Sequence, residues 1–185
     1  MMWRKIIVWT AILGLAGCRT PDVPLFTIQD FQNQDPVSVA VASVQIMDKT
    51  ERFTELPHIE TRIPVVPSYA LKRALQRRFT AAAPTSRDGM EIVVEEASLI
   101  QTYLPSPEWY VQNNMEYMLR YRVQVSYTRA GRPLETQTIT GWEKQALPKR
   151  SSLVDKETAW AKMLNAMITK VADKIQTDLP PDLAL

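Results

Sequence analysis

The residues best able to do chemistry in this chain are few, since it has one cysteine, Cys18, and one histidine, His58. A single histidine excludes multi-histidine metal centres, and the lack of a second cysteine excludes thiolate metal sites and an intramolecular disulfide. A Ser–His–Asp triad would have to use His58, which lies in a proline-flanked segment, and no Gly-x-Ser-x-Gly motif accompanies it. We therefore interpret His58 as an exposed loop residue, expect no metal and no cofactor, and predict that the protein is not an enzyme.

Carboxylates and glycines add no catalytic pair. Glu95 and Glu96 are neighbours in an expected strand, so their side chains are predicted to point to opposite faces and not to share a substrate. The chain has five glycines and no glycine-rich phosphate loop. A hydrolase would therefore need carboxylates brought together from distant loops.

Four residues are candidates for binding a partner. Trp109 and Tyr110 lie in a loop bounded by prolines and asparagines, where aromatic side chains with a polar end are typical of interfaces. The alternative is that they fold back as a lid over the core. Arg120 and Arg122 lie on the polar side of an alternating strand, where they either meet an acidic partner or lipid phosphate, or remain a solvated face.

The amino terminus has the layout of a secretory signal. Arg4 and Lys5 precede an apolar run, Ile6 to Leu15, that is short for a permanent membrane helix. The sequence Leu15-Ala16-Gly17-Cys18 then resembles the lipobox of bacterial lipoproteins. This resemblance implies that residues 1–17 are removed and that Cys18 is acylated. The alternatives are an uncleaved membrane anchor, or an ordinary secretory signal in which Cys18 is incidental.

The charge of the mature chain is balanced. Cleavage before Cys18 leaves 168 of the 185 residues, which is the size of one domain. Two of the 22 basic side chains, Arg4 and Lys5, leave with the signal, so 20 basic and 20 acidic side chains remain. A balanced surface gives no indication of nucleic-acid binding.

Composition divides the mature chain into three parts. Residues 18–36 carry the predicted lipidated cysteine and a proline-containing tether, although the apolar residues within Leu25 to Phe31 are expected to dock on the domain. Residues 37–179 form the predicted single α+β domain, which we expect to lie in the periplasm, and residues 180–185 form a short tail.

Hydrophobic periodicity predicts six elements within the domain. Strands are expected at 37–47, 90–103, 117–127 and 134–146, and helices at 68–81 and 153–177. The clearest strand alternates through Tyr117, Leu119, Tyr121, Val123, Val125 and Tyr127, and Gly131 favours a hairpin to the next strand. The order β-α-β-β-β-α predicts a two-layer α+β sandwich, in which two helices cover a mostly antiparallel four-stranded sheet.

The first predicted helix has a basic side, formed by Lys72, Arg73, Gln76 and Arg77. Such a surface is usually solvated, and the alternative is a contact with anionic lipid headgroups.

The chain resembles two sets of proteins. It is similar to a group of uncharacterised alphaproteobacterial lipoproteins through Leu56-Pro57-His58-Ile59-Glu60, Pro64-Val65-Val66-Pro67, Val94-Glu95-Glu96-Ala97-Ser98, Tyr121 and Trp160. In element order it resembles the lipopolysaccharide-assembly lipoproteins and the auxiliary lipoproteins of lipid-exporting ABC transporters.

The second resemblance implies a periplasmic domain, held to a membrane by acyl chains, that binds an envelope protein or a lipid. Where the residue after the cysteine sorts lipoproteins, Arg19 implies the outer membrane, with the inner membrane as the alternative. We predict a non-enzymatic accessory or binding component of envelope lipid transport or outer-membrane assembly. The alternative is a small-ligand or lipid carrier that uses a cleft between the sheet and the helices.

Overall fold

The structure is a computed structural model that describes residues 26–28, 31, 35–106 and 114–184. Its elements in chain order are β1 (Val37–Val39), β2 (Ser43–Asp48), η1 (Glu60–Arg62), α1 (Pro67–Arg78), β3 (Phe79–Ala81), β4 (Gly89–Leu104), β5 (Asn114–Arg129), β6 (Arg132–Pro148) and α2 (Leu153–Thr177). Among these residues, no helix combines the length and the apolar character needed to cross a membrane.

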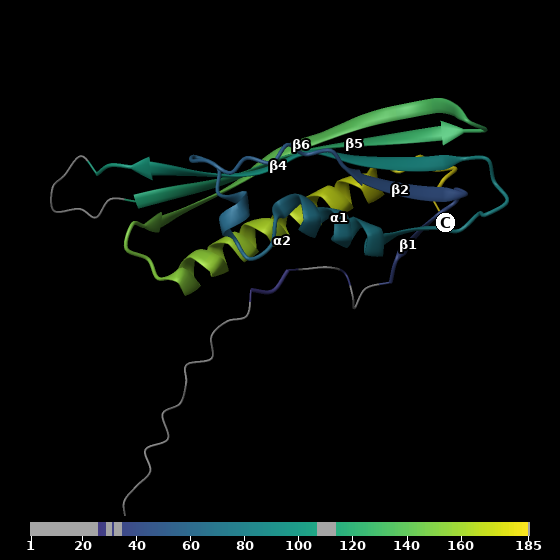
Figure 1. Cartoon of the computed structure of the whole chain (residues 1–185). Coiled ribbons are helices and arrows are strands. Elements are labelled where there is room, and N and C mark those ends of the chain that lie inside the picture. The colour runs from purple at the N-terminus through teal and green to yellow at the C-terminus, as the bar shows by residue number, and fades with distance from the viewer. Residues whose placement is uncertain (1–25, 29–30, 32–34, 107–113, 185) are drawn as a thin grey trace, which may run out of the picture.

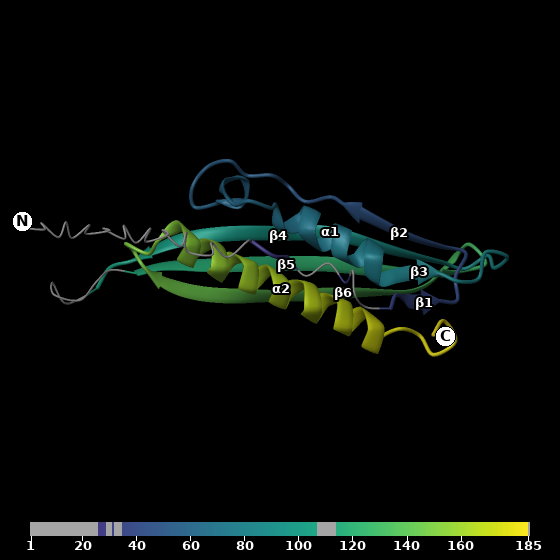
Figure 2. The same ribbon diagram turned by 90° about the horizontal axis from the view of Figure 1, so that it is seen from below.

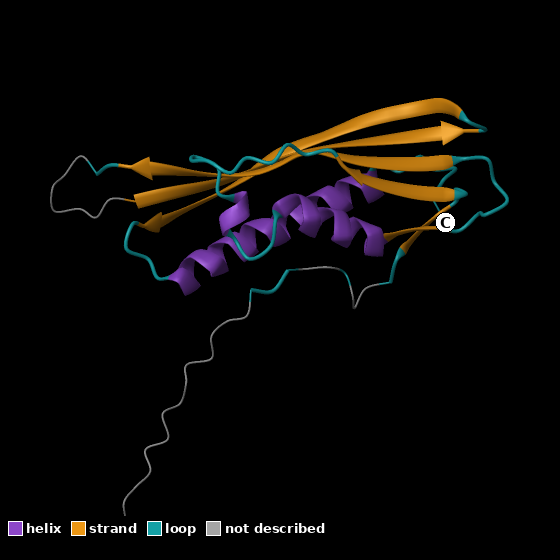
Figure 3. Ribbon diagram, in the orientation of Figure 1, coloured by secondary structure: helices purple, strands orange, loops and turns teal. Residues whose placement is uncertain are grey.

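The main sheet has four strands in the order β2-β4-β5-β6, so β2 and β6 are its outer strands (Figure 1). β2 runs parallel to β4, whereas the β4–β5 and β5–β6 pairs are antiparallel. Both helices lie on one face of this sheet, and the other face carries no helix, as the two perpendicular views agree (Figures 2 and 3). The predicted α+β fold, with a mainly antiparallel four-stranded sheet and two helices, is confirmed.

The core forms where the predicted apolar faces meet. The alternating side chains of β5, from Tyr117 to Tyr127, point toward the helices and are buried, as their period of two predicts. α2 buries a stripe at spacings of three and four residues, formed by Trp160, Met163, Leu164, Met167, Ile168, Val171, Ala172 and Ile175. The aromatic rings of Tyr117 and Trp160 meet edge to face, with their centroids 5.7 Å apart. The two-layer core therefore follows from the sequence pattern.

The first predicted strand is divided in two. β1 pairs in parallel with β3, with Val37 opposite Phe79, and these two strands form a separate small sheet. The chain passes to the main sheet between Ala40 and Ala42, whose backbone N–H groups donate to the carbonyls of Leu183 and Asp88. The prediction that the first helix continues to residue 81 is wrong because the chain enters β3 at Phe79.

The β5–β6 hairpin turns at two residues with positive φ, Ala130 at 48° and Gly131 at 79°. Positive φ at both central residues is characteristic of a type I′ turn, whose twist matches that of the flanking strands. The carboxylate of Asp88 accepts a hydrogen bond from the Ala130 N–H over 2.9 Å. The predicted hairpin is confirmed, and its strands are longer than the sequence indicated.

The described part of the amino-terminal segment lies on the helical layer, as Figures 1 and 2 show. Phe26 and Ile28 pack against the core, and Phe31 is only 7% exposed. The side-chain amide of Asn165 in α2 donates to the carbonyl of Thr27 over 3.1 Å. The Arg78 guanidinium lies 5.4 Å from the centre of the Phe31 ring. The predicted docking of this segment is therefore confirmed for its described residues.

Candidate functional site

Arg120 and Arg122 are exposed on the sheet face opposite the helices. The strand register places Ser98, Arg120 and Trp142 in one row across β4, β5 and β6, and Glu96, Arg122 and Thr140 in the next. The residues of these two rows other than Ser98 line an open hollow of about 400 Å³. We call this surface, formed by Glu96, Arg120, Arg122, Thr140 and Trp142, the outer-face site.

A β-bulge sets the position of Glu96 in this site. The β4–β5 register shifts between Val94 and Glu96, so Glu95 has no partner residue on β5. Strict alternation of Glu95 and Glu96, which the sequence predicts, is therefore interrupted, because a bulge adds one residue to one strand. Glu96 comes into register with Arg122 and accepts a hydrogen bond from the Ser98 hydroxyl over 3.1 Å.

Trp142 is the part of the site that the sequence did not reveal. Its side chain is 61% exposed, and the Lys144 ammonium lies 5.6 Å from its ring centre, within the range of a cation–π interaction. Because β6 has few apolar residues, its pattern did not indicate which face Trp142 occupies. Tryptophan and arginine dominate the binding energy of many protein interfaces, so this combination suits the binding of a partner.

Directly behind the outer-face site, the Tyr121 side chain covers the face of the sheet that is turned toward the helices. Gly141 lies directly opposite Tyr121 in the register, and a Cβ atom on Gly141 would lie 2.3 Å from the Tyr121 hydroxyl oxygen. The tyrosine ring therefore occupies the space that a side chain at position 141 would take. Burial and the nearby Glu143 carboxylate raise the pKa of Tyr121, opposed by the Lys170 ammonium.

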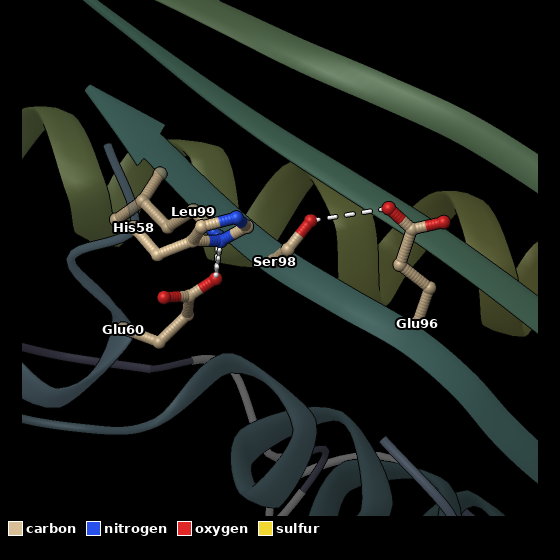
Figure 4. A network of polar contacts seen from close by, with 5 residues as sticks. All are labelled: His58, Glu60, Glu96, Ser98 and Leu99. Atoms are coloured by element: carbon tan, nitrogen blue, oxygen red, sulfur yellow. Dashed lines mark hydrogen bonds and ion pairs between the residues drawn. The ribbon is translucent and has the colours of Figure 1, made fainter. Parts of the chain in front are cut away.

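His58 belongs to a buried network at the edge of β4 (Figure 4). Its Nδ1 atom lies 3.0 Å from Oε1 of Glu60, and its ring stacks on Phe53 with the centroids 4.3 Å apart. The backbone N–H of Leu99 donates to the same Glu60 oxygen over 2.9 Å. The interpretation of His58 as an exposed loop residue is wrong, because its side chain is only 23% exposed and is held by these contacts.

This network takes the place of a neighbouring strand. β2 pairs with β4 only as far as Val94, and beyond that point the loop at residues 57–60 runs along the β4 edge. The Ile59 N–H donates to the Leu99 carbonyl over 2.9 Å, and the Gln101 N–H donates to the Pro57 carbonyl over 2.8 Å. Because buried backbone groups need partners, the Glu60 carboxylate completes a hydrogen-bond ladder that the loop backbone leaves open.

The network contains no arrangement for nucleophilic catalysis. The Ser98 hydroxyl points toward Glu96 and donates to it, as Figure 4 shows, whereas His58 contacts Glu60. Within residues 26–28, 31, 35–106 and 114–184, no group of three or more histidine, cysteine, aspartate or glutamate side chains could hold a metal ion. The geometry supports a structural role for His58 and Glu60.

Three other predicted site residues lie outside the described part of the chain. Trp109 and Tyr110 fall within residues 107–113, and Cys18 falls within residues 1–25. The basic side of α1 is described, and Lys72, Arg73 and Gln76 line a second hollow of about 470 Å³ together with residues that follow β2.

The domain is a small α+β sandwich with two helices on one sheet face and with arginine and tryptophan side chains on the other. Its sequence gives the class: residues 57–179 match the model of a family described as lipopolysaccharide-assembly. The match covers more than half of the chain, and the protein belongs to this family, LptE. The resemblance to the lipopolysaccharide-assembly lipoproteins is thereby confirmed, and the protein takes part in outer-membrane assembly in the bacterial envelope.

Solved structures of other lipoproteins are similar to the chain at low sequence identity. A minor lipoprotein from Acinetobacter baumannii is 12% identical with a TM-score of 0.39, and the alignment covers 72% of this chain and 91% of that one. Rare lipoprotein B from Shewanella oneidensis is 15% identical with a TM-score of 0.40, covering 73% and 94%. Lipoprotein B from Nitrosomonas europaea is 14% identical with a TM-score of 0.40, covering 75% and 89%. No curated protein matches the chain.

Proposed function

We propose that the protein is a non-enzymatic accessory lipoprotein of lipopolysaccharide assembly, which binds an envelope protein through the outer-face site. The observation that supports this proposal is that Arg120, Arg122 and Trp142 lie together on the sheet face that neither helix covers (Figure 2). Family membership supports the process, lipopolysaccharide assembly. The site supports the mode of action, which is binding rather than chemistry.

The chemistry of the site favours an acidic partner surface. Arg122 has Glu96 beside it in the register, whereas the neighbours of Arg120 in its row are Ser98 and Trp142. The Arg120 guanidinium therefore has no carboxylate in its own row. A partner carboxylate could accept two hydrogen bonds from it, while an apolar group of the partner covers the exposed indole of Trp142.

The membrane anchor is the second part of the proposal. Acylation of Cys18 after removal of residues 1–17 would hold residues 18–36 as a tether and residues 37–179 as a periplasmic domain. Each buried methylene contributes about 0.8 kcal/mol, so several acyl chains make a lasting anchor. Arg19 favours residence in the outer membrane. Mass spectrometry of the purified protein tests this part, because the expected amino-terminal peptide begins with an acylated Cys18.

Crosslinking in intact cells tests the binding site. A photoreactive amino acid at Thr140, which is exposed in the site, should crosslink to an envelope protein. The crosslink should be lost in the Arg120→Glu/Arg122→Glu variant and retained in the Arg132→Glu/Arg150→Glu variant, which has the same change of charge at two exposed positions elsewhere. An equal yield in the wild type and in both variants would show that the outer-face site does not bind the partner.

A further inference from the structure

The β6 edge of the main sheet has no neighbouring strand. β6 is 17 residues long and pairs with β5 on one side only. Within the described part of the chain, no backbone–backbone hydrogen bond joins residues 132–147 to any segment other than β5. The other edge differs, because the loop at residues 57–60 continues the pairing of β4 beyond the end of β2. The domain therefore covers one edge of its sheet and leaves the β6 edge open (Figure 2).

The hydrogen bonds of Leu99 show how the backbone groups of the sheet are directed. In an antiparallel ladder, a residue directs its N–H and its C=O to the same side, and successive residues alternate between the two sides. The Leu99 N–H donates to Glu60, and the Leu99 C=O accepts from the Ile59 N–H, so both groups point away from β5. Leu119 lies opposite Leu99 on β5. Leu119 therefore exchanges no hydrogen bonds with β4 and directs its backbone groups to β6.

The same alternation determines which β6 groups reach the open edge. Leu119 lies opposite Glu143, and the β5–β6 register is regular along this stretch. Glu143 is therefore bonded to β5, as is every second residue before it. The residues that alternate with these, Thr138, Thr140 and Trp142, direct their N–H and C=O groups to the open edge. Their side chains are exposed on the outer face of the sheet.

The centre of β6 has the composition of a strand that can accept a partner strand. The seven residues from Thr136 to Trp142 include no charged residue and no proline, and four of them are β-branched threonine or isoleucine. Proteins block open sheet edges with charges, prolines and bulges. In β6 these features lie outside the centre, since Pro133 and Pro148 are near its ends and the register shift lies next to the hairpin turn. The central stretch is therefore available for pairing.

The open edge is continuous with the outer-face site. Thr140 and Trp142 contribute their side chains to that site and their backbone groups to the edge. A strand added to the edge would lie about 4.8 Å from β6, and every second side chain of this strand would extend the outer face beside Trp142. A partner that covers the outer-face site as an extended segment therefore uses both sets of groups.

We propose that the envelope partner binds by strand addition, with an extended segment of the partner pairing with β6 from Thr136 to Trp142. This inference rests on the proposed function and deepens it, because it names the form in which the partner is bound. The main-chain hydrogen bonds supply affinity, and the side chains of the outer-face site select the segment. Within that segment, an apolar side chain packs on Trp142, and an acidic side chain two positions along lies on the same face and meets the basic side chains of the site.

Hydrogen exchange of single backbone amides tests the pairing. The full acylated protein is purified free of the partner and in complex with the envelope protein that crosslinks from Thr140. In the free protein, the amides of Thr138, Thr140 and Trp142 should exchange rapidly, whereas those of Ile139 and Gly141, which are bonded to β5, should exchange slowly. In the complex, exchange at the first three amides should slow by at least about tenfold, and the alternation should disappear.

A proline substitution removes one donor from the open edge. Thr138→Pro lacks an N–H that β5 does not use, and proline is tolerated in edge strands, so its urea midpoint should match that of the control. The control is Ala146→Pro, which removes an N–H directed to the same edge outside the central stretch. We expect recovery of the complex to fall about tenfold in Thr138→Pro and to stay at the wild-type level in Ala146→Pro. Equal recovery with the two folded variants overturns the inference, and if Thr138→Pro does not fold, the exchange measurement on the wild type decides.

The outcomes separate this inference from the proposed function. Rapid exchange at all three amides, in a complex that the Arg120→Glu/Arg122→Glu variant fails to form, overturns strand addition and leaves the proposed function in place. Copurification of an untagged copy of the chain with a tagged one would assign the slowed exchange to a β6–β6 pair and would also overturn the inference. A complex that forms equally well with the Arg120→Glu/Arg122→Glu variant contradicts the proposed function and, with it, this inference.

Discussion

Replacing Glu60 with alanine removes the acceptor that completes the hydrogen bonding of the β4 edge. The Leu99 N–H, which donates to Glu60 Oε1 over 2.9 Å in a buried environment, would then have no partner. A buried donor left unsatisfied costs about 1–3 kcal/mol. The side chain is 7% exposed, and the substitution also removes its buried Cγ methylene, about 0.8 kcal/mol, and the hydrogen bond to His58 Nδ1, about 1 kcal/mol.

One effect acts in the opposite direction. The second carboxylate oxygen, Oε2, is buried without a hydrogen-bond partner, so its removal relieves an unfavourable desolvation. Burying a polar atom without a partner costs about 1–3 kcal/mol by mutational data. The balance predicts that Glu60→Ala lowers the free energy of unfolding by about 2 kcal/mol, on the scale of these contributions.

Urea denaturation followed by tryptophan fluorescence, to which the buried Trp160 contributes, measures this change. Glu60→Gln is the matched control, because its amide oxygen can still accept from Leu99 while the charge is lost, and we expect it to cost less than about 1 kcal/mol. A Glu60→Ala protein within about 0.5 kcal/mol of the wild type, the range of ordinary surface substitutions, would refute the role assigned to Glu60.

Three further predictions concern the sheet. Gly141→Ala should destabilise the protein by about 1–3 kcal/mol, because the new Cβ meets the Tyr121 ring. In thermal unfolding, adding Tyr121→Leu to this variant should restore part of the lost stability. If it restores none, the clash is contradicted. Ala130 has a φ of 48°, in the left-handed region that glycine adopts more easily than alanine. Ala130→Gly should therefore raise the free energy of unfolding by about 0.5–1 kcal/mol in urea titrations. A loss of stability would argue against this backbone conformation. Burial, with Glu135 and Asp178, raises the pKa of Tyr127 to about 12. Between about pH 10 and 12 the unfolded chain therefore binds fewer protons than the folded one, so stability should fall as pH rises. Tyr127→Phe should weaken this dependence in pH-dependent denaturation, and an unchanged dependence would contradict the role of Tyr127.

Periodic patterns account for the parts of the fold that the sequence predicted. The alternation from Tyr117 to Tyr127 and the stripe on α2 each present one apolar face, and only a two-layer arrangement buries both. The same alternation correctly put Arg120 and Arg122 on the exposed face. These features depend on local period, which a single sequence contains.

Features that depend on distant pairing could not be predicted in this way. Phe79 leaves the helix because β1, some forty residues earlier, offers it a strand partner. His58 is partly buried because β2 ends before β4 does, and the bulge at Glu95 arises in pairing with β5. Trp142 was missed for the same reason, since its face is set by its place opposite Arg120 rather than by the composition of β6.

The unequal outer strands of the sheet limit how copies of the chain can associate through their backbones. One edge strand of the sheet is β6, with 17 residues, and the other is β2, with six residues. Beyond β2, the loop at residues 57–60 pairs with the rest of the β4 edge. In a head-to-tail arrangement, β6 of one copy would pair with the much shorter β2 of the next copy. Most of β6 would then have no strand partner. Pairing β6 with β6 matches equal lengths and closes on a two-fold axis. Backbone association of the described domain through its outer strands thus favours a pair of copies over an open-ended ribbon.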